Sequence, residues 1–418
     1  MAVSGAVLEN EKVGVDSMPD RVLIRRIRLQ NLLSFGPDSD WIDLQPLNVL
    51  VGPNGVGKSN LLSAIDLLRA APRDLHEALS RNGRIEDWIW KGRGGNGAAS
   101  IEAVVDNPWW SEGLTYSLSF TKHPLYFQIT KESVEAAPAP PGAETPYYVY
   151  HNDAGEAQYR TVPQPQATFD VTAPRSTGAG PVDGARSVLY SYRGPTYPEI
   201  TYLSEQFGRI GFYLTAGFGP NDALKRPQPT DLPRGFVNED GSNLSLVINR
   251  LRVERRLSAL FDEKMNQFAD DIEGIDILVE AGTIQIVART RGMQTVIPMS
   301  RLSDGTIRYL CLLSILCEPS PPPLVCIEEP ELGLHPDILP GLVDLMVEAS
   351  SRTQLVVTTH SDIILDALTS RPQSVLVAEK EDGQTHLKRL DEDQLRGWLN
   401  DYRLGQVWLK GAIGGTRW

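Results

Sequence analysis

The chain is poor in cysteine and contains no long apolar run. Only three of its 418 residues are cysteines. None belongs to a C-x-x-C pair, so they support neither a zinc site nor a disulfide framework and fit a reducing compartment. No apolar run approaches the roughly 18–20 residues that a membrane span needs. The first twenty residues also lack the basic start and apolar stretch of a signal peptide. We therefore expect a cytoplasmic protein without a membrane partner. The cysteines are Cys311, Cys317 and Cys326.

An excess of positive charge is also lacking, since the formal net charge is −13. Proteins that coat nucleic acid without sequence preference usually carry the opposite sign. DNA binding is therefore less expected, although a local basic patch is not excluded. Residues 244–268 have apolar positions at helical spacing but no continuing heptad repeat, which argues against a long coiled-coil arm. This predicted helix carries several arginines, which either contact nucleic acid or form a solvated helix face: Arg250, Arg252, Arg255 and Arg256.

The order of apolar segments indicates the fold class. After residue 306, helical and strand patterns alternate, which predicts an α/β fold with a largely parallel central sheet. Short strands are expected over 100–130, and a hairpin near 275–289. Segments 135–147, 155–187 and 217–243 are predicted loops, and we expect the middle one to dock a partner. The predicted division is a flexible tail over 1–20, an N-terminal lobe with a β-rich subregion over 21–200, a helical and hairpin insertion over 201–298, and a C-terminal lobe over 299–418.

A glycine-rich segment stands between a predicted strand and a predicted helix, and it matches G-x-x-x-x-G-K-[ST] at every defined position. Glycines let backbone N–H groups approach phosphate oxygens, and the following helix adds its positive end. The lysine would neutralise β- and γ-phosphate charge, and the serine hydroxyl would bind Mg²⁺. The sequence thus predicts an ATP site with Mg²⁺. Its residues are Gly52, Pro53, Asn54, Gly55, Val56, Gly57, Lys58 and Ser59, followed by Asn60.

Two acids, Glu328 and Glu329, end a predicted buried strand over 324–327. Parallel strands in α/β folds place ligand groups at their carboxyl ends. Beside a phosphate loop, we expect Glu328 to hold Mg²⁺ and Glu329 to polarise the attacking water.

Four further segments complete a resemblance to ABC-type ATPases of the SMC, RecF and OLD group. Leu302-Ser303-Asp304-Gly305-Thr306 resembles the LSGGQ signature, and the run from Glu328 to Pro336 resembles the Walker B and D-loop segments. Thr359-His360-Ser361 resembles the switch-histidine segment, and Asn31 to Phe35 the N-x-x-S-F element. The resemblance covers roughly residues 21–70 and 300–418. It implies an ABC-type ATPase head.

The resemblance also implies a mechanism in which two heads meet face to face with ATP between them. Ser303, Asp304 and Gly305 of one head would contact the nucleotide on the other, at a helix N-terminus. Lys58 and His360 would contact the γ-phosphate in cis, and hydrolysis would release the dimer. A serine before an apolar helix is also an ordinary cap, and a histidine after a strand can be a core residue, so both alternatives stay open.

The sequence departs from the family pattern in several places. Glu328 stands where transporters have aspartate, His335 replaces the D-loop aspartate, and Gln128 is not a convincing Q-loop residue. OLD nucleases carry a TOPRIM domain with an acidic cluster, whereas this chain ends about 58 residues after His360. The acidic residues near its end suggest a hairpin turn instead: Glu379, Glu381 and Asp382. The chain thus most resembles stand-alone prokaryotic ATPases that act beside a separately encoded effector, often in anti-phage defence.

Three functions follow from these observations. The first is an ATP-hydrolysing switch that dimerises on ATP and controls a separate effector, such as a nuclease. The second is an ATP-held scaffold that sequesters a partner while hydrolysis is incidental. The third is a RecF-like DNA repair ATPase, for which the net charge is unfavourable.

Overall fold

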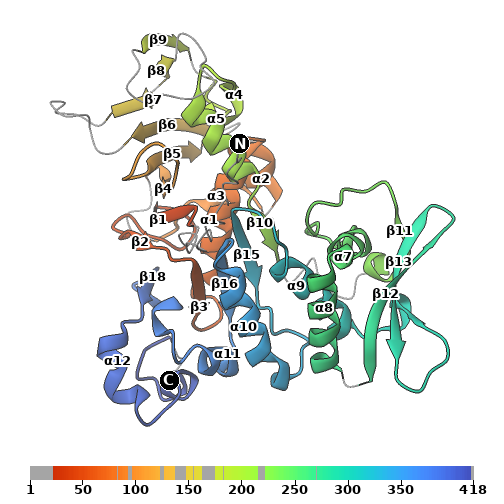
Figure 1. Ribbon diagram of the computed structural model, residues 1–418. Helices are drawn as coiled ribbons and strands as arrows, with labels where there is room; N and C mark the ends of the chain where they lie inside the picture. The colour runs from red at the N-terminus through yellow and green to blue at the C-terminus, as the bar shows by residue number, and fades with distance from the viewer. Residues whose placement is uncertain are drawn as a thin grey trace, which may run out of the picture.

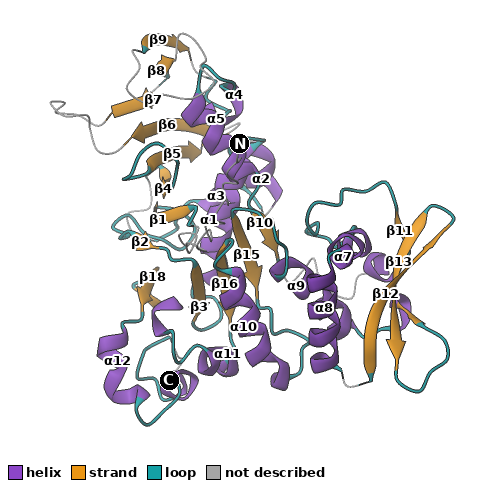
Figure 2. Cartoon of the chain, in the orientation of Figure 1, coloured by secondary structure: helices purple, strands orange, loops and turns teal. Residues whose placement is uncertain are grey.

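The protein is organised around three β-sheets, and Figures 1 and 2 show the arrangement in a computed structural model. The tail predicted over 1–20 lies outside the residues that the structure describes. The predicted division into lobes stays a prediction. The structure describes residues 22–81, 83–92, 97–122, 127–136, 147–153, 155–161, 175–181, 183–214, 222–269 and 271–415.

A six-stranded sheet forms the centre of the molecule and confirms the predicted α/β class. Its first five strands are parallel, and the last pairs antiparallel with its neighbour. Strands β3 and β16 are buried along their whole length because other elements cover both faces of the sheet. In spatial order the strands are β10 (Gly211–Tyr213), β15 (Leu324–Glu328), β16 (Gln354–Thr359), β3 (Leu47–Val51), β17 (Val375–Glu381) and β18 (Gln384–Arg389).

Alternate residues of these strands supply two separate hydrophobic cores. Leu50 and Val356 belong to one core, while Val49 and Val357 belong to the other. The first core contains residues of α1 (Lys58–Ala70), α2 (Leu75–Arg81), α4 (Val188–Ser191) and α5 (Pro198–Gly208), with α3 (Ile85–Trp88) beside α2. The second contains residues of α9 (Asp304–Leu316), α10 (Leu339–Ala349), α11 (Asp362–Ala367), α12 (Glu392–Leu399) and α13 (Leu404–Leu409).

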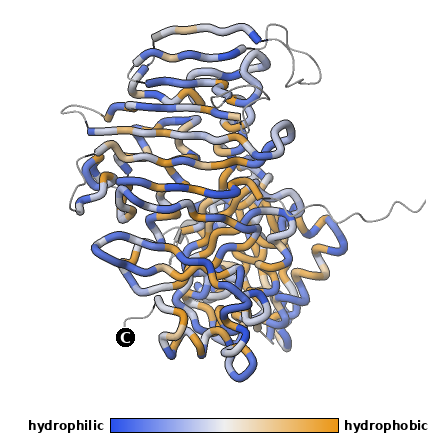
Figure 3. The backbone as a smooth tube through the Cα atoms, turned by 90° about the vertical axis from the view of Figure 1, so that its left-hand side faces the viewer, coloured by the Kyte–Doolittle hydropathy of each residue, from blue (hydrophilic) through white to orange (hydrophobic). Residues whose placement is uncertain are grey.

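An eight-stranded antiparallel sheet extends from the first core. Figure 3, turned by a quarter, shows its strands stacked as successive rungs above the central part of the chain. Arg26, Arg28 and Gln30 alternate with the buried Ile27 and Leu29 in strand β1. The order is β2 (Ile42–Asp43), β1 (Ile24–Gln30), β4 (Ala99–Val105), β5 (Leu114–Lys122), β6 (Phe127–Ala136), β7 (Tyr147–Asp153), β8 (Glu156–Thr161) and β9 (Ser176–Pro181).

The prediction of a patternless loop over 155–187 is wrong where the structure describes it. Strands β8 and β9 lie in this segment and add the last two rungs to the sheet. Backbone hydrogen bonds to a preceding strand order them, so the weak apolar alternation of the segment was no guide. Of the loop expected over 135–147, residues 137–146 lie outside the described part of the chain.

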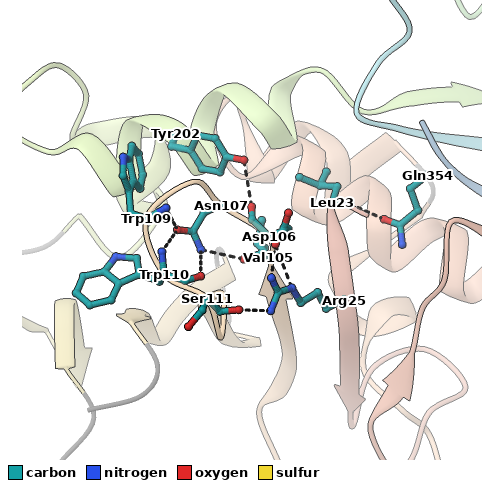
Figure 4. A network of polar contacts seen from close by, with 10 residues as sticks. All are labelled: Leu23, Arg25, Val105, Asp106, Asn107, Trp109, Trp110, Ser111, Tyr202 and Gln354. Carbon is teal, nitrogen blue, oxygen red and sulfur yellow. Dashed lines mark hydrogen bonds and ion pairs between the residues drawn. The ribbon is translucent and has the colours of Figure 1, made fainter. Parts of the chain in front are cut away.

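A polar junction joins the eight-stranded sheet to the central sheet (Figure 4). The buried Gln354 side chain accepts hydrogen bonds from the Leu23 and Ile24 N–H groups at 3.1 and 2.9 Å and donates to the Ile24 carbonyl. Nearby, Arg25 pairs with Asp106, whose carbonyl accepts a hydrogen bond from the Tyr202 hydroxyl. Strand β1 is therefore held against the start of β16 through side-chain bonds to its backbone.

A smaller sheet lies on the other side of the molecule with two helices (Figure 1). The hairpin of β12 (Ile272–Glu280) and β13 (Thr283–Thr290) is confirmed, and β11 (Gln228–Pro229) and β14 (Ile297–Pro298) pair with β13. Strand β11 and α6 (Asp222–Lys225) lie within the loop predicted over 217–243.

The single helix predicted over 244–268 is wrong, because two helices occupy the segment. Helix α7 (Leu244–Val253) ends at Glu254, whose backbone is extended, and α8 (Arg255–Phe268) begins directly after it. The buried positions stop at Leu251 and resume only at Phe261, a gap of several helical turns that lets the two helices take different directions. Across the described residues, no helix is long and apolar enough to cross a membrane.

A buried carboxyl group in the eight-stranded sheet gives a first prediction. Glu132 accepts hydrogen bonds from the Tyr116 hydroxyl at 2.7 Å and the Val188 N–H at 2.8 Å, and it also contacts Ser187. Burial raises the pKa of Glu132 to about 7. Its folded-state pKa thus exceeds the unfolded value, so its contribution to stability is lost as pH rises from about 4.5 to 7.

We expect Glu132→Gln to flatten this part of the stability profile, because an amide does not titrate. The measurement is the urea midpoint of wild type and variant at pH 5, 6, 7 and 8. The difference in urea midpoint between variant and wild type should shift in favour of the variant as pH rises. A constant difference across the series would contradict the prediction, and Glu254→Gln, at an exposed site, is the control.

Candidate functional site

The glycine-rich segment folds as a loop between β3 and α1, as the sequence predicts. Gly57, the residue before α1, has φ 113°, a left-handed conformation that favours glycine. A side chain at Gly52 would collide with the Ala378 carbonyl of β17. Asn54 and Gly55 are exposed, Pro53 is half-buried and Val56 is buried beneath them. The loop thus presents its tip to solvent and fixes its base to the sheet.

Lys58 is buried at the base of this loop. Its Nζ donates to the Gly52 and Pro53 carbonyls at 2.8 and 3.0 Å. Burial lowers the pKa of Lys58 to about 8, while the carboxylates of Glu329, Glu331 and Glu328 act in the opposite direction. The ammonium group therefore lies between the loop and the acids at the end of β15.

A cluster of polar side chains supports the loop from behind. The Thr385 hydroxyl, on β18, lies 2.6 Å from Ser34 Oγ and 2.6 Å from the Val56 carbonyl oxygen. Asn60 Nδ2 donates to Ser34 Oγ at 2.7 Å. Ser34 of the N-x-x-S-F element thus links the first turn of α1 to the β17–β18 hairpin. Asn60, expected at the nucleotide, also has this structural role.

Ser59 and Glu328 come together at the mouth of the loop. The Ser59 hydroxyl donates to Glu328 Oε1 at 2.7 Å, although 269 residues separate them. No cluster of three or more His, Cys, Asp or Glu side chains in the described ranges could hold a metal by itself. Mg²⁺ usually takes one or two protein oxygens and completes its shell with water and substrate phosphates. A hydroxyl and a carboxylate in contact beside a phosphate loop fit that requirement.

Glu329 has an unusual backbone conformation, with φ 43°. Left-handed values are uncommon for residues other than glycine and cluster at functional sites. The Glu329 N–H donates to the Thr358 carbonyl at 3.0 Å, and Glu329 Oε1 lies 3.4 Å from His360 Nε2. Both side chains are partly exposed, at 28% and 33%. The structure therefore brings the expected general base beside the expected switch histidine.

Two residues that sequence reasoning left without a role lie in the same place. Glu331 accepts hydrogen bonds from Thr359 Oγ1 and from the His360 N–H, both at 2.7 Å, and burial raises the pKa of its carboxyl. Arg308, buried on α9, donates to the Glu329 carbonyl at 2.7 Å. The only signal for Glu331 was its place two residues after Glu329. Arg308 had none, because it stands in an apolar helix pattern.

The signature segment forms the start of α9. Ser303 caps the helix by accepting the Thr306 N–H at 3.1 Å, so the ordinary cap exists. Ser303 and Asp304 remain exposed, and Asp304 pairs with Lys225 Nζ at 2.6 Å. A side chain at Gly305 would collide with the Gly333 carbonyl. Among the described residues, no hydrogen bond or ion pair joins these three residues to the phosphate loop.

The remaining expectations have simple structural outcomes. Gln128 is exposed on β6, and His335 is exposed and accepts the Asp337 N–H. The acidic residues near the end of the chain do lie at the β17–β18 hairpin, although Glu379 also accepts a hydrogen bond from the Gly415 N–H.

Some arginines of the segment 244–268 have partners within the chain. Arg250 pairs with Glu318, and Arg252 with Asp262. Two of the four arginines considered for nucleic acid are therefore engaged within the chain.

The sequence matches the AAA_21 family, described as "AAA domain, putative AbiEii toxin, Type IV TA system", over residues 47–107 and 146–366. These ranges contain the phosphate loop, the signature, Glu328, Glu329 and His360. The chain belongs to this family. The AAA_21 assignment makes it a P-loop ATPase family member, and membership implies ATP binding.

Two kinds of relative agree with the AAA_21 assignment. The Old nuclease of Escherichia phage P2 is 27% identical over 138 residues, which is 28% of this chain and 24% of that protein. An SMC head bound to the C-winged helix domain of ScpA matches 89% of this chain and 99% of its own, at TM-score 0.57 and 15% identity. A Pyrococcus furiosus Smc head with an extended coiled coil matches at TM-score 0.54 and 14% identity, covering 91% and 99%. The fold is thus of the SMC-head type.

Proposed function

We propose that this AAA_21 protein is a Mg²⁺-dependent ATPase switch that closes into a head-to-head dimer around ATP and controls a separately encoded effector. The observation that carries the proposal is the convergence at the mouth of the phosphate loop. Lys58, the Ser59–Glu328 pair and the Glu329–His360 pair come from three parts of the chain and meet there. A cation site, a base and a phosphate-binding loop are the parts that ATP hydrolysis needs.

Each residue has a defined task in this proposal. The loop N–H groups and Lys58 bind the phosphates, and Ser59 and Glu328 would hold Mg²⁺, which would neutralise phosphate charge. Glu329 accepts a proton from the attacking water, and His360, which lies 3.4 Å from the Glu329 carboxylate, would contact the γ-phosphate. Exposed Ser303 and Asp304 at the start of α9 are suited to a nucleotide on a second copy.

The effector is proposed from the family and its relatives. The family description names a toxin–antitoxin system, and the P2 relative is named a nuclease. A role in anti-phage defence, in the cytoplasm, suits both descriptions and the three buried free thiols. DNA binding is less favoured, because Arg250 and Arg252 are already paired within the chain.

The dimer is tested by mass in solution. We expect the wild type to double its mass by light scattering when Mg²⁺ and a non-hydrolysable ATP analogue are added. Ser303→Arg should bind the analogue but remain a monomer, because its long side chain would occupy the space that the partner's triphosphate needs. Ser351→Arg, at an exposed serine after α10, is the matched control and should still dimerise.

An unchanged wild-type mass would refute the sandwich dimer, and equal dimerisation of both arginine variants would place the contact elsewhere. The scaffold alternative differs in one respect. It requires partner assembly to be as stable during turnover as with the analogue, whereas a switch must release the partner as ATP is consumed.

A further inference from the structure

Arg308 makes an unusual connection between two parts of the site. It lies on α9, and only 7% of it is exposed. Its Nη2 donates to the Glu329 carbonyl at 2.7 Å and lies 3.5 Å from the Glu328 carbonyl. One guanidinium group on the signature helix therefore holds the backbone of both acids that follow β15.

The backbone that Arg308 holds is the strained one. Glu329 has φ 43°, a conformation that is strained for a residue with a side chain. Its N–H is held by the Thr358 carbonyl, and its C=O by Arg308. The conformation turns the peptide so that the side chain points to His360. Without the guanidinium, one of these two anchors would be missing.

The same helix reaches the acid loop at a second point. Gly305, one turn before Arg308, packs so closely on the Gly333 carbonyl that a side chain would not fit. Gly333 belongs to the loop that starts at Glu329. The first turn of α9 also carries Ser303 and Asp304, which are exposed. A displacement of this turn would therefore be passed to the loop of Glu329 through both contacts.

We propose that Arg308 is the positioning residue that couples the exposed signature turn to Glu329 in the same chain. When a nucleotide on the second copy contacts Ser303 and its neighbours, α9 shifts or stiffens, and Arg308 sets the Glu329 carboxylate for hydrolysis of this chain's own ATP. The inference rests on the proposed function and deepens it, because it makes hydrolysis in one head depend on closure of the pair.

A purely structural arginine would have a different signature. Its loss would lower stability and ATP binding together, and lysine would restore the rate along with them. If Arg308 positions Glu329, its planar guanidinium group matters, because it donates to the Glu329 carbonyl while it is directed at the Glu328 carbonyl. A lysine ammonium is instead a point charge on a flexible stem. A matched control contacts the same helix from the turn after α10. Arg352 donates to the Leu316 carbonyl at 2.7 Å, at the opposite end of α9.

The experiment compares Arg308→Lys, Arg308→Ala and Arg352→Ala in the full chain. The four readouts are ATP turnover at saturating Mg²⁺-ATP, the KM for ATP, the mass in solution with the ATP analogue, and hydrogen exchange of the amides over 329–334. We expect both Arg308 variants to keep dimerisation and a KM within about threefold, while kcat falls about 100-fold, as for a misplaced catalytic group. Lysine should restore little of the rate. Exchange over 329–334 should quicken, and Arg352→Ala should leave all four readouts unchanged.

The outcomes separate this inference from the function on which it rests. If wild-type turnover depends on Glu329 but Arg308→Ala keeps its kcat, or loses dimerisation and ATP binding as well, the coupling role is overturned and the ATPase stands. If the wild type shows no turnover that depends on Glu329, the proposed function is overturned and the inference with it.

Discussion

Replacing Glu329 by glutamine is expected to lower ATP turnover by about 100-fold or more, the usual contribution of a general base, while ATP still binds. The amide keeps the size of the side chain but cannot accept a proton. The backbone anchors of Glu329, to Thr358 and Arg308, do not involve the carboxylate and should persist. The loss should therefore appear in kcat and leave the Kd for ATP within about threefold.

The measurement is steady-state phosphate release together with nucleotide binding by calorimetry. Since ATP would be bound and not consumed, the variant should also accumulate as the ATP-held dimer. Glu254→Gln, at the exposed break between α7 and α8, should behave as wild type. Unchanged turnover in Glu329→Gln would remove the role that we assign to this residue. Running each assay with and without duplex DNA tests the repair alternative, which requires stimulation with a steep salt dependence.

Replacing Lys58 by methionine is expected to weaken ATP binding about 100-fold, because a charge-assisted bond to phosphate contributes up to about 3 kcal/mol. Methionine keeps the aliphatic stem, so the buried base of the loop should stay packed. Lys131→Met, at an exposed site paired with Asp153, is the control and should bind ATP as wild type does. Equal affinity of the Lys58 variant and wild type would contradict the proposed phosphate contact.

The pKa of Lys58 adds a pH dependence to the same experiment. Burial lowers this pKa to about 8 in the free protein. The phosphates favour the charged form, so ATP binding takes up a proton above that pH. Affinity should therefore be constant below about pH 7 and weaken as pH rises beyond 8, by up to about tenfold per unit. Lys58→Met should lack this slope. A slope that persists in the variant would assign the titration to another group.

Local pattern was a sound guide where a segment's own residues decide its structure. The phosphate loop needs glycine at Gly57 because of its left-handed backbone, and the buried strand before Glu328 is apolar throughout. Pattern was a poor guide where neighbours decide. Strands β8 and β9 have weak alternation but are ordered by pairing. The helix over 244–268 breaks at Glu254, after which α8 packs mostly on β12, while α7 packs on α9 and β13.

The sequence by itself predicted a phosphate-binding loop, because its glycines, Lys58 and Ser59 all lie between Gly52 and Ser59. It also determined that two acids end a buried strand. Only the tertiary structure decided that Glu328 meets Ser59 across 269 residues, that Arg308 holds the carbonyl of Glu329, and that Glu331 accepts the His360 N–H. The reason is physical. Local geometry follows from neighbouring residues, whereas such contacts depend on strand order in a sheet, which many distant residues set together.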